Sequence, residues 1–211
     1  MQLLKIVGIV LFFLVNVSIM QPAWADRPRL TQSDDYTEVT QTLSKLLQAQ
    51  DTLEDTKYDA AGLQQKIGEL QLQKYILESS SGWAQCLNQT GKTLAVYAHK
   101  PQKKANFTSA QSTLYYLRDG EVTDDDWNCD GVFLPTGVKV AGIADQELAE
   151  PLAVKLVPGT QLVAKTNPDT SAVEFNVAPA KIFAAGEGTW DIPSLSQTDV
   201  DAQVPNAPIE D

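Results

Sequence analysis

The chain has 211 residues, with 16 Lys and Arg against 27 Asp and Glu, which gives a formal net charge of -11. This balance argues against nucleic acid as a partner, because nucleic-acid binding requires a basic surface. The length suffices for one compact domain with an extension, or for two small domains.

The first 25 residues have the three parts of a secretory signal peptide. Lys5 supplies the positive charge, an almost wholly apolar run extends from Ile6 to Ile19, and Ala23-Trp24-Ala25 presents small residues at a cleavage site. An uncleaved N-terminal anchor is the alternative, although the run is shorter than the roughly 20 residues of a membrane span. We expect cleavage near Ala25, an exported mature protein, and a flexible lead-in over residues 26–33.

Residues 34–78 have the periodicity of an amphipathic helix, which Ser33 or Asp34 would cap. A phase shift near Lys57 indicates either a stutter in one continuous helix, the interpretation we favour, or a helical hairpin that turns near Thr56–Asp59. A continuous helix would need a partner for its apolar stripe. The expected interaction residues of this stripe are Val39, Leu43, Leu46, Leu53, Leu63, Ile67 and Leu70.

After the Ser79–Gly82 break, β-branched and aromatic residues alternate with turns, which predicts a β domain over residues 83–190. The third strand could instead be a short helix over residues 109–118. Strands of this length favour a small antiparallel β-sandwich or barrel, and the whole chain is predicted to be α+β. The expected strands are 83–87, 93–99, 112–117, 131–143, 152–157, 161–166, 172–177 and 181–184.

The two cysteines, Cys86 and Cys129, are predicted to form one disulfide that staples the β domain. Two buried thiols or a metal pair are the alternatives. With His99 as the only histidine, the chain has too few soft ligands for a closed zinc site.

The segment from Asp126 to Gly131 matches the first half of a calcium-binding loop. Asp126, Asn128 and Asp130 place oxygen ligands at alternate positions, and Gly131 permits the sharp turn. Gly137 occupies the position where such a loop has its bidentate Glu. The alternative is a solvated acidic turn held by the disulfide.

No catalytic constellation is evident, and the chain is predicted not to be an enzyme. His99 lacks the companions of a nucleophilic or zinc-protease motif, and Gly91-Lys92-Thr93 lacks the first glycine of a phosphate-binding loop, so no nucleotide is expected. The aromatic residues of the β domain are either core residues or a face for a sugar or peptide. They are Trp83, Trp127, Trp190, Tyr97, Tyr115 and Tyr116.

The last segment, residues 191–211, contains Pro193, Pro205 and Pro208, several acidic residues and neither Lys nor Arg. Its composition predicts a disordered acidic tail, because it buries too little apolar surface to offset the entropy of ordering.

The run Trp83-Ala84-Gln85-Cys86-Leu87-Asn88-Gln89-Thr90-Gly91-Lys92 opens the β domain after an export signal and an amphipathic helix. In this layout the chain resembles uncharacterised cyanobacterial proteins exported to the periplasm or thylakoid lumen. The resemblance implies an extracytoplasmic compartment and carries no known activity.

These features together favour a non-enzymatic interaction or accessory protein without a cofactor. Its helix would dock on a protein partner, such as a membrane-bound complex, or on a second copy, and its β domain would add a second contact surface. The alternative is a ligand-binding module, for calcium through Asp126, Asn128 and Asp130 or for a glycan through exposed tryptophans.

Overall fold

The computed structural model describes residues 29–52, 58–101, 111–144 and 146–210. The predicted signal peptide therefore lies outside the described residues. The expected flexible lead-in is wrong for its second half, because Leu30–Gln32 form a 3-10 turn, η2, and the Leu30 side chain is buried. Burial of the Leu30 side chain stabilises this turn, although the mostly polar composition of residues 26–33 predicts a flexible segment.

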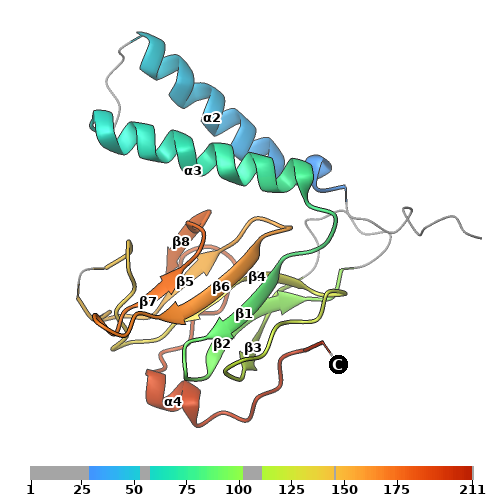
Figure 1. Cartoon of the computed structure of the whole chain (residues 1–211), viewed down its shortest axis with the longest axis vertical. Coiled ribbons are helices and arrows are strands. Elements are labelled where there is room, and N and C mark those ends of the chain that lie inside the picture. Colours follow the sequence, from blue (N-terminus) through green and yellow to red (C-terminus); the bar gives the residue numbers. More distant parts are fainter. Residues whose placement is uncertain (1–28, 53–57, 102–110, 145, 211) are drawn as a thin grey trace, which may run out of the picture.

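Two helices follow, α2 (Asp34–Thr52) and α3 (Ala60–Ser79), and they pack against each other as an antiparallel hairpin (Figure 1). The hydroxyl of Ser33 accepts a hydrogen bond from the Tyr36 amide at 3.1 Å, which confirms a cap at the start of α2. The Asp59 carboxylate caps α3 by accepting from the Gly62 amide at 2.7 Å. The favoured continuous helix is thus wrong and the hairpin alternative is correct, because the second cap starts a new helix that buries the apolar face of the first.

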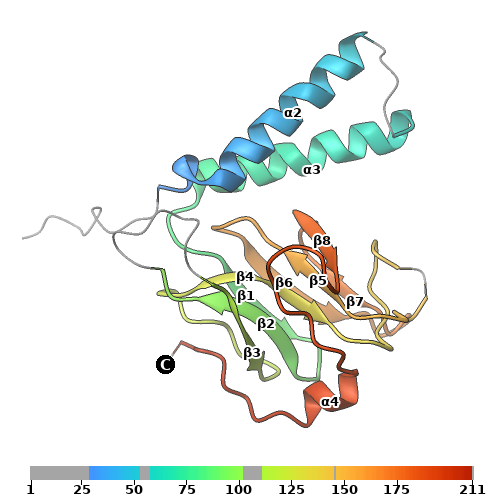
Figure 2. The same cartoon turned by 180° about the vertical axis from the view of Figure 1, so that it is seen from behind.

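The hairpin has its own apolar cluster, which also joins it to the rest of the molecule. Val157, which follows the fifth strand, packs into this cluster from the β domain. The hairpin therefore packs against one end of the sheets, as Figures 1 and 2 show. The other buried members of the cluster are Leu30, Val39, Leu43, Ile67, Leu70 and Leu77.

Eight strands form two sheets, one with the order β1-β6-β7 and one with the order β3-β2-β4-β5-β8. The larger sheet is antiparallel, as expected, but β1 pairs with β6 in parallel, with Cys86 opposite Leu162. The expected all-antiparallel arrangement is therefore wrong for this pair, because β1 and β6 both begin beside the hairpin, where the Ser80 hydroxyl donates to the Gly159 carbonyl and the Gln85 amide donates to the Thr160 carbonyl. The strands are β1 (Gln85–Gln89), β2 (Leu94–His99), β3 (Thr113–Leu117), β4 (Asn128–Leu134), β5 (Leu152–Lys155), β6 (Gln161–Thr166), β7 (Val173–Phe175) and β8 (Lys181–Ala184).

Most expected strands are present, with one substantial shift. The segment expected as a strand over 131–143 begins at Asn128 and ends at Leu134 in β4. Pro135 follows directly, and proline has no amide hydrogen to continue a strand ladder. The third strand is β3 and not the alternative short helix.

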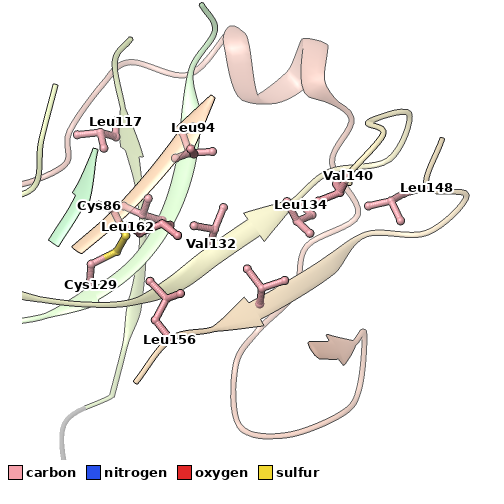
Figure 3. Packing of buried hydrophobic residues seen from close by; sticks show 13 residues of the cluster. Cys86, Leu94, Leu117, Cys129, Val132, Leu134, Val140, Leu148, Leu156 and Leu162 are labelled. Atoms are coloured by element: carbon pink, nitrogen blue, oxygen red, sulfur yellow. A yellow bond between two sulfur atoms is a disulfide. The ribbon is translucent and has the colours of Figure 1, made fainter. Parts of the chain in front are cut away.

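The two sheets enclose one core, which the predicted disulfide crosses (Figure 3). Cys86 on β1 is bonded to Cys129 on β4, and their Cα atoms are 6.0 Å apart. A cross-link over 43 residues removes denatured-state entropy worth about 4 kcal/mol on the chain-entropy model. The disulfide thereby ties the small sheet to the large one at the centre of the core.

The C-terminal segment is ordered and covers the second face of the large sheet, so the expected disordered tail is wrong. Ile192 and Val200 are buried against Ala95, Tyr97 and Phe133 of that face. Helix α4 (Gln197–Asp201) lies at the end of the molecule away from the hairpin (Figures 1 and 2). A few apolar side chains suffice here because the sheet face they meet is itself apolar.

Candidate functional site

The three residues expected to bind calcium do not form a loop. Asp126 lies in an exposed acidic turn, in which the Trp127 amide donates to the Asp124 carbonyl, but Asn128 and Asp130 lie in β4, so the expected turn is correct only as far as Trp127. The Asn128 side chain accepts from the Ala84 amide at 3.0 Å and donates to Asp130 at 2.6 Å, while Asp126 lies 3.9 Å from the Lys100 ammonium. Within the described ranges, no three His, Cys, Asp or Glu side chains are grouped to hold a metal ion.

Asp130 instead gathers a polar cluster at the end of β2, β3 and β4 that the sequence analysis missed. One carboxylate oxygen of Asp130 lies 2.6 Å from His99 Nδ1 and accepts the hydroxyl hydrogen of Ser112 at 2.8 Å. The serine therefore donates to the carboxylate and not to the imidazole, which is not the order of a nucleophilic triad. The cluster fastens three strand ends beside the disulfide. Sequence reasoning could not find this cluster, because His99 comes close to Asp130 only through the register of β2 against β4, which pairs His99 with Asn128.

The aromatic residues of the β domain pack against one another. Trp190 stacks on Tyr97 with ring centroids 4.4 Å apart and meets Phe183 edge-on, and Trp127 meets Tyr115 edge-on. Burial, with the nearby Asp191, raises the pKa of Tyr97 far above its ordinary value. Trp83, Trp127 and Trp190 are each partly buried, so each exposes only part of its surface.

The expected interaction stripe faces inward. Val39, Leu43, Ile67 and Leu70 are buried in the hairpin cluster, and Leu46 and Leu63 pack partly buried against it. Leu53 lies outside the described residues. The stripe therefore joins the two helices to each other, and any docking by the hairpin must use its outside.

A different face of α3 is exposed and uncharged over about three turns. We call it the outer face, and it is defined by Gln64, Gly68, Gln71, Leu72 and Tyr75. The side chain of Leu72 is 44% exposed and that of Tyr75 is 65% exposed. The face ends at the ion pair between Lys74 and Glu78, whose hydrogen bond raises the pKa of Lys74 and lowers that of Glu78. A solvated helix face normally carries charges, which makes an uncharged one informative.

Gly68 stands in the middle of the outer face. Apart from the adjoining backbone of α3 itself and the two neighbouring residues, no atom of the described residues lies within 4 Å of the position that a Cβ would take at Gly68. Packing within the chain therefore gives no reason for glycine, which costs about 1 kcal/mol relative to alanine in a helix interior. A missing side chain at this point lets the backbone of another element approach closely.

Between the hairpin and the edge of the large sheet lies a cavity of about 90 Å³, which we call the hairpin cavity. Lys155 pairs with Asp35, and Lys181 pairs with Glu38 at 2.6 Å, so two ion pairs join α2 to β5 and β8 across it. Gln73 of α3 also lines the cavity, with only 5% of its surface exposed. Its Nε2 is one of two buried side-chain polar atoms in the described part of the chain without a hydrogen-bond partner.

Comparison with known proteins does not supply a function. No family model, curated protein or solved structure matches this chain. Among the described residues, no helix is both long and apolar enough to cross a membrane.

Proposed function

We propose that this protein is an exported, non-enzymatic accessory protein that docks on another protein through the outer face of α3. The observation that carries the proposal is the uncharged exposed surface that contains Leu72 and Tyr75. The centres of protein interfaces are depleted in charged residues and enriched in aromatic ones. An extracytoplasmic location, in the periplasm or thylakoid lumen, is supported by the Cys86–Cys129 disulfide.

The element that fits this face is a helix of another protein. That helix would have an uncharged face of its own. Residues 64, 68, 71, 72 and 75 follow the helical repeat, so they form a straight strip along α3. Gly68 lies at its middle, where a crossing helix would come nearest, and the distance between packed helices depends on the side chains at the contact. Tyr75 and Leu72 would then anchor the contact on one side of the crossing.

The experiment replaces Gly68 by arginine in the mature protein. Arginine is a good helix former, so the substitution should keep or raise the melting temperature while it blocks close approach. With a photo-crosslinker at Gln71, we expect crosslinks to a helix of one membrane-bound complex in the native extracytoplasmic fraction, and the Gly68→Arg protein should lose them. Ser44→Arg places the same side chain on an exposed position of α2 and should leave the crosslinks intact.

Three outcomes would contradict this proposal. Equal crosslinking of the Gly68→Arg and Ser44→Arg proteins would show that the outer face does not dock. Crosslinks only to a second copy, with a mass that rises with concentration, would replace the accessory function by self-association. Crosslinks that map to a strand or loop of the partner would remove the helix as the docking element.

A further inference from the structure

We propose that the helical hairpin is a movable arm, which separates from the β domain as a folded unit when the ion pairs of α2 with β5 and β8 are weakened. The pivot is the junction of Ser80 with Gly159, and the movement opens the hairpin cavity. This conformational change goes beyond the proposed docking function and does not depend on it.

The first argument is that the hairpin has its own core. Its apolar cluster contains buried side chains from both helices, such as Val39 of α2 and Ile67 of α3. The β domain contributes one buried side chain to this cluster, that of Val157. Because the other buried members belong to the helices and to η2, the two helices keep most of their mutual contacts when the hairpin separates from the sheets.

The second argument is the incomplete contact between α3 and the β domain. The hairpin cavity, of about 90 Å³, and a second cavity of about 30 Å³ both lie in this contact. Gln73 lines both cavities, and its buried Nε2 has no hydrogen-bond partner among the described residues. A buried donor without a partner destabilises the docked arrangement, and separation returns this donor to water.

The third argument is the charge of the groups that join the two parts. Lys155 of β5 pairs with Asp35, and Lys181 of β8 pairs with Glu38 at 2.6 Å. Both carboxylates lie on α2, three residues apart, and therefore on the same face of the helix. About half of the Lys181 and Glu38 side chains is exposed, so dissolved salt screens this pair. The docked arrangement is therefore sensitive to ionic strength.

The fourth argument is the connection between the two parts. The chain passes from the hairpin to the β domain once, through residues 80–84 (Figure 1). The Ser80 hydroxyl donates to the Gly159 carbonyl at 3.2 Å, and the Gln85 amide donates to the Thr160 carbonyl at 2.9 Å. Between them, Gly82 gives the backbone freedom to turn. No described residue other than its two chain neighbours has an atom within 4 Å of the Cβ position at Gly82.

The test places spin labels on the mature protein at the exposed positions Ser44→Cys in α2 and Ser194→Cys beyond β8, since its own cysteines are paired. Pulsed electron paramagnetic resonance measures the distance between the two labels. We expect a docked and a separated population, and the separated fraction should rise at least threefold between about 0.01 M and about 1 M NaCl, because the Debye length falls from about 30 Å to about 3 Å. Helix content, measured by circular dichroism, should stay constant.

Matched variants identify the groups that control the separation. Lys181→Gln should raise the separated fraction at least threefold at low salt and reduce its salt dependence. Lys139→Gln removes the same charge from an exposed position after β4 and should change neither. Gln73→Leu should lower the separated fraction at least threefold, because the docked contact then contains no unpaired amide. Gln71→Leu, at an exposed position of the same helix, is its control and should leave the fraction unchanged.

Several results would overturn the inference. A single distance population under all these conditions would show that the hairpin is a fixed part of the β domain. A longer distance that appears together with a loss of helix content would mean unfolding of the hairpin and not separation. Equal salt dependence of Lys181→Gln and Lys139→Gln would remove the ion pairs as the cause, and equal separated fractions in Gln73→Leu and Gln71→Leu would remove the buried amide.

Discussion

Gly131 marks the point where the core leaves least room for a side chain. A Cβ at this position would lie 2.1 Å from the backbone oxygen of Val154 and 2.7 Å from the ring of Trp190. Glycine therefore permits β4 to pair with β5 while the Trp190 ring lies directly on the strand. The constraint comes from neighbouring atoms and not from an unusual backbone angle.

We expect Gly131→Ala to lower the free energy of unfolding by about 3 kcal/mol or more, since a rigid backbone atom and a packed ring must move. Urea unfolding measures this change. Gly82→Ala is the matched control, because no described residue other than its two chain neighbours has an atom within 4 Å of its Cβ position. It should shift stability by less than about 0.5 kcal/mol. Equal effects of the two substitutions would show that Trp190 does not lie against β4.

At the scale of an element, α4 illustrates how a very short helix becomes stable. Ser196 and Asp199 form a reciprocal capping box, in which the Ser196 amide and hydroxyl donate to the Asp199 carboxylate at 2.8 and 2.6 Å. These hydrogen bonds lower the pKa of Asp199 below its ordinary value of 3.8. Val200 then buries its side chain against the large sheet.

The lowered pKa of Asp199 predicts acid sensitivity of this end of the molecule. Because the folded state favours the ionised carboxylate, its contribution to stability is full above about pH 3.8 and is lost as the pH falls through the lower, folded-state pKa. Titration of the Asp199 carboxyl carbon by NMR should give a midpoint below 3.8. A midpoint at or above that value would contradict the capping box.

Variants separate the cap from general acid unfolding. Ser196→Ala should cost about 1 kcal/mol near neutral pH. It should also move the Asp199 midpoint back toward 3.8, because the two strongest hydrogen bonds to that carboxylate come from Ser196. Ser194→Ala, two residues earlier and outside the capping box, is the control and should leave the midpoint unchanged.

At the scale of the whole molecule, the hairpin lies against one end of the two sheets, and α4 lies at the opposite end (Figures 1 and 2). The hairpin rests on the sheets at the turn after β5, where Gly159 has a φ of +86°. A Cβ at Gly159 would lie 2.6 Å from Ser80 and 2.7 Å from Leu30. The left-handed backbone and this close approach both require glycine.

We expect Gly159→Ala to loosen the hairpin from the sheets, because the strained backbone and the clash with Leu30 and Ser80 act at the same junction. Amide hydrogen exchange should show protection in α2 and α3 reduced tenfold or more, with β4 changed much less. The control is Gly82→Ala, which lies in the connection from α3 to β1 and has open space around its Cβ position. A uniform loss of protection over all elements would show instead that hairpin and sheets unfold as one unit.

The sequence by itself determined the features that depend on near neighbours in the chain. A cap at Ser33 or Asp34, most strand segments between turn residues and the pairing of the only two cysteines were predicted. Periodicity and turn chemistry act over a few residues, and a disulfide between the only two cysteines leaves no choice of connectivity.

Only the tertiary structure decided what lies against each apolar or polar side chain. The stripe of Val39 and Ile67 showed that a helix face would be buried, but burial by the second helix or by another protein leaves the same pattern in the sequence. The same holds for the parallel pairing of β1 with β6, the ordered C-terminal segment, and the meeting of His99 with Asp130. Gln73 looked like a solvated glutamine among many, and only the placement of α3 on the β domain made its amide a buried donor. These outcomes depend on surfaces that are far apart in the chain, and the free energy of burial acts only where they meet.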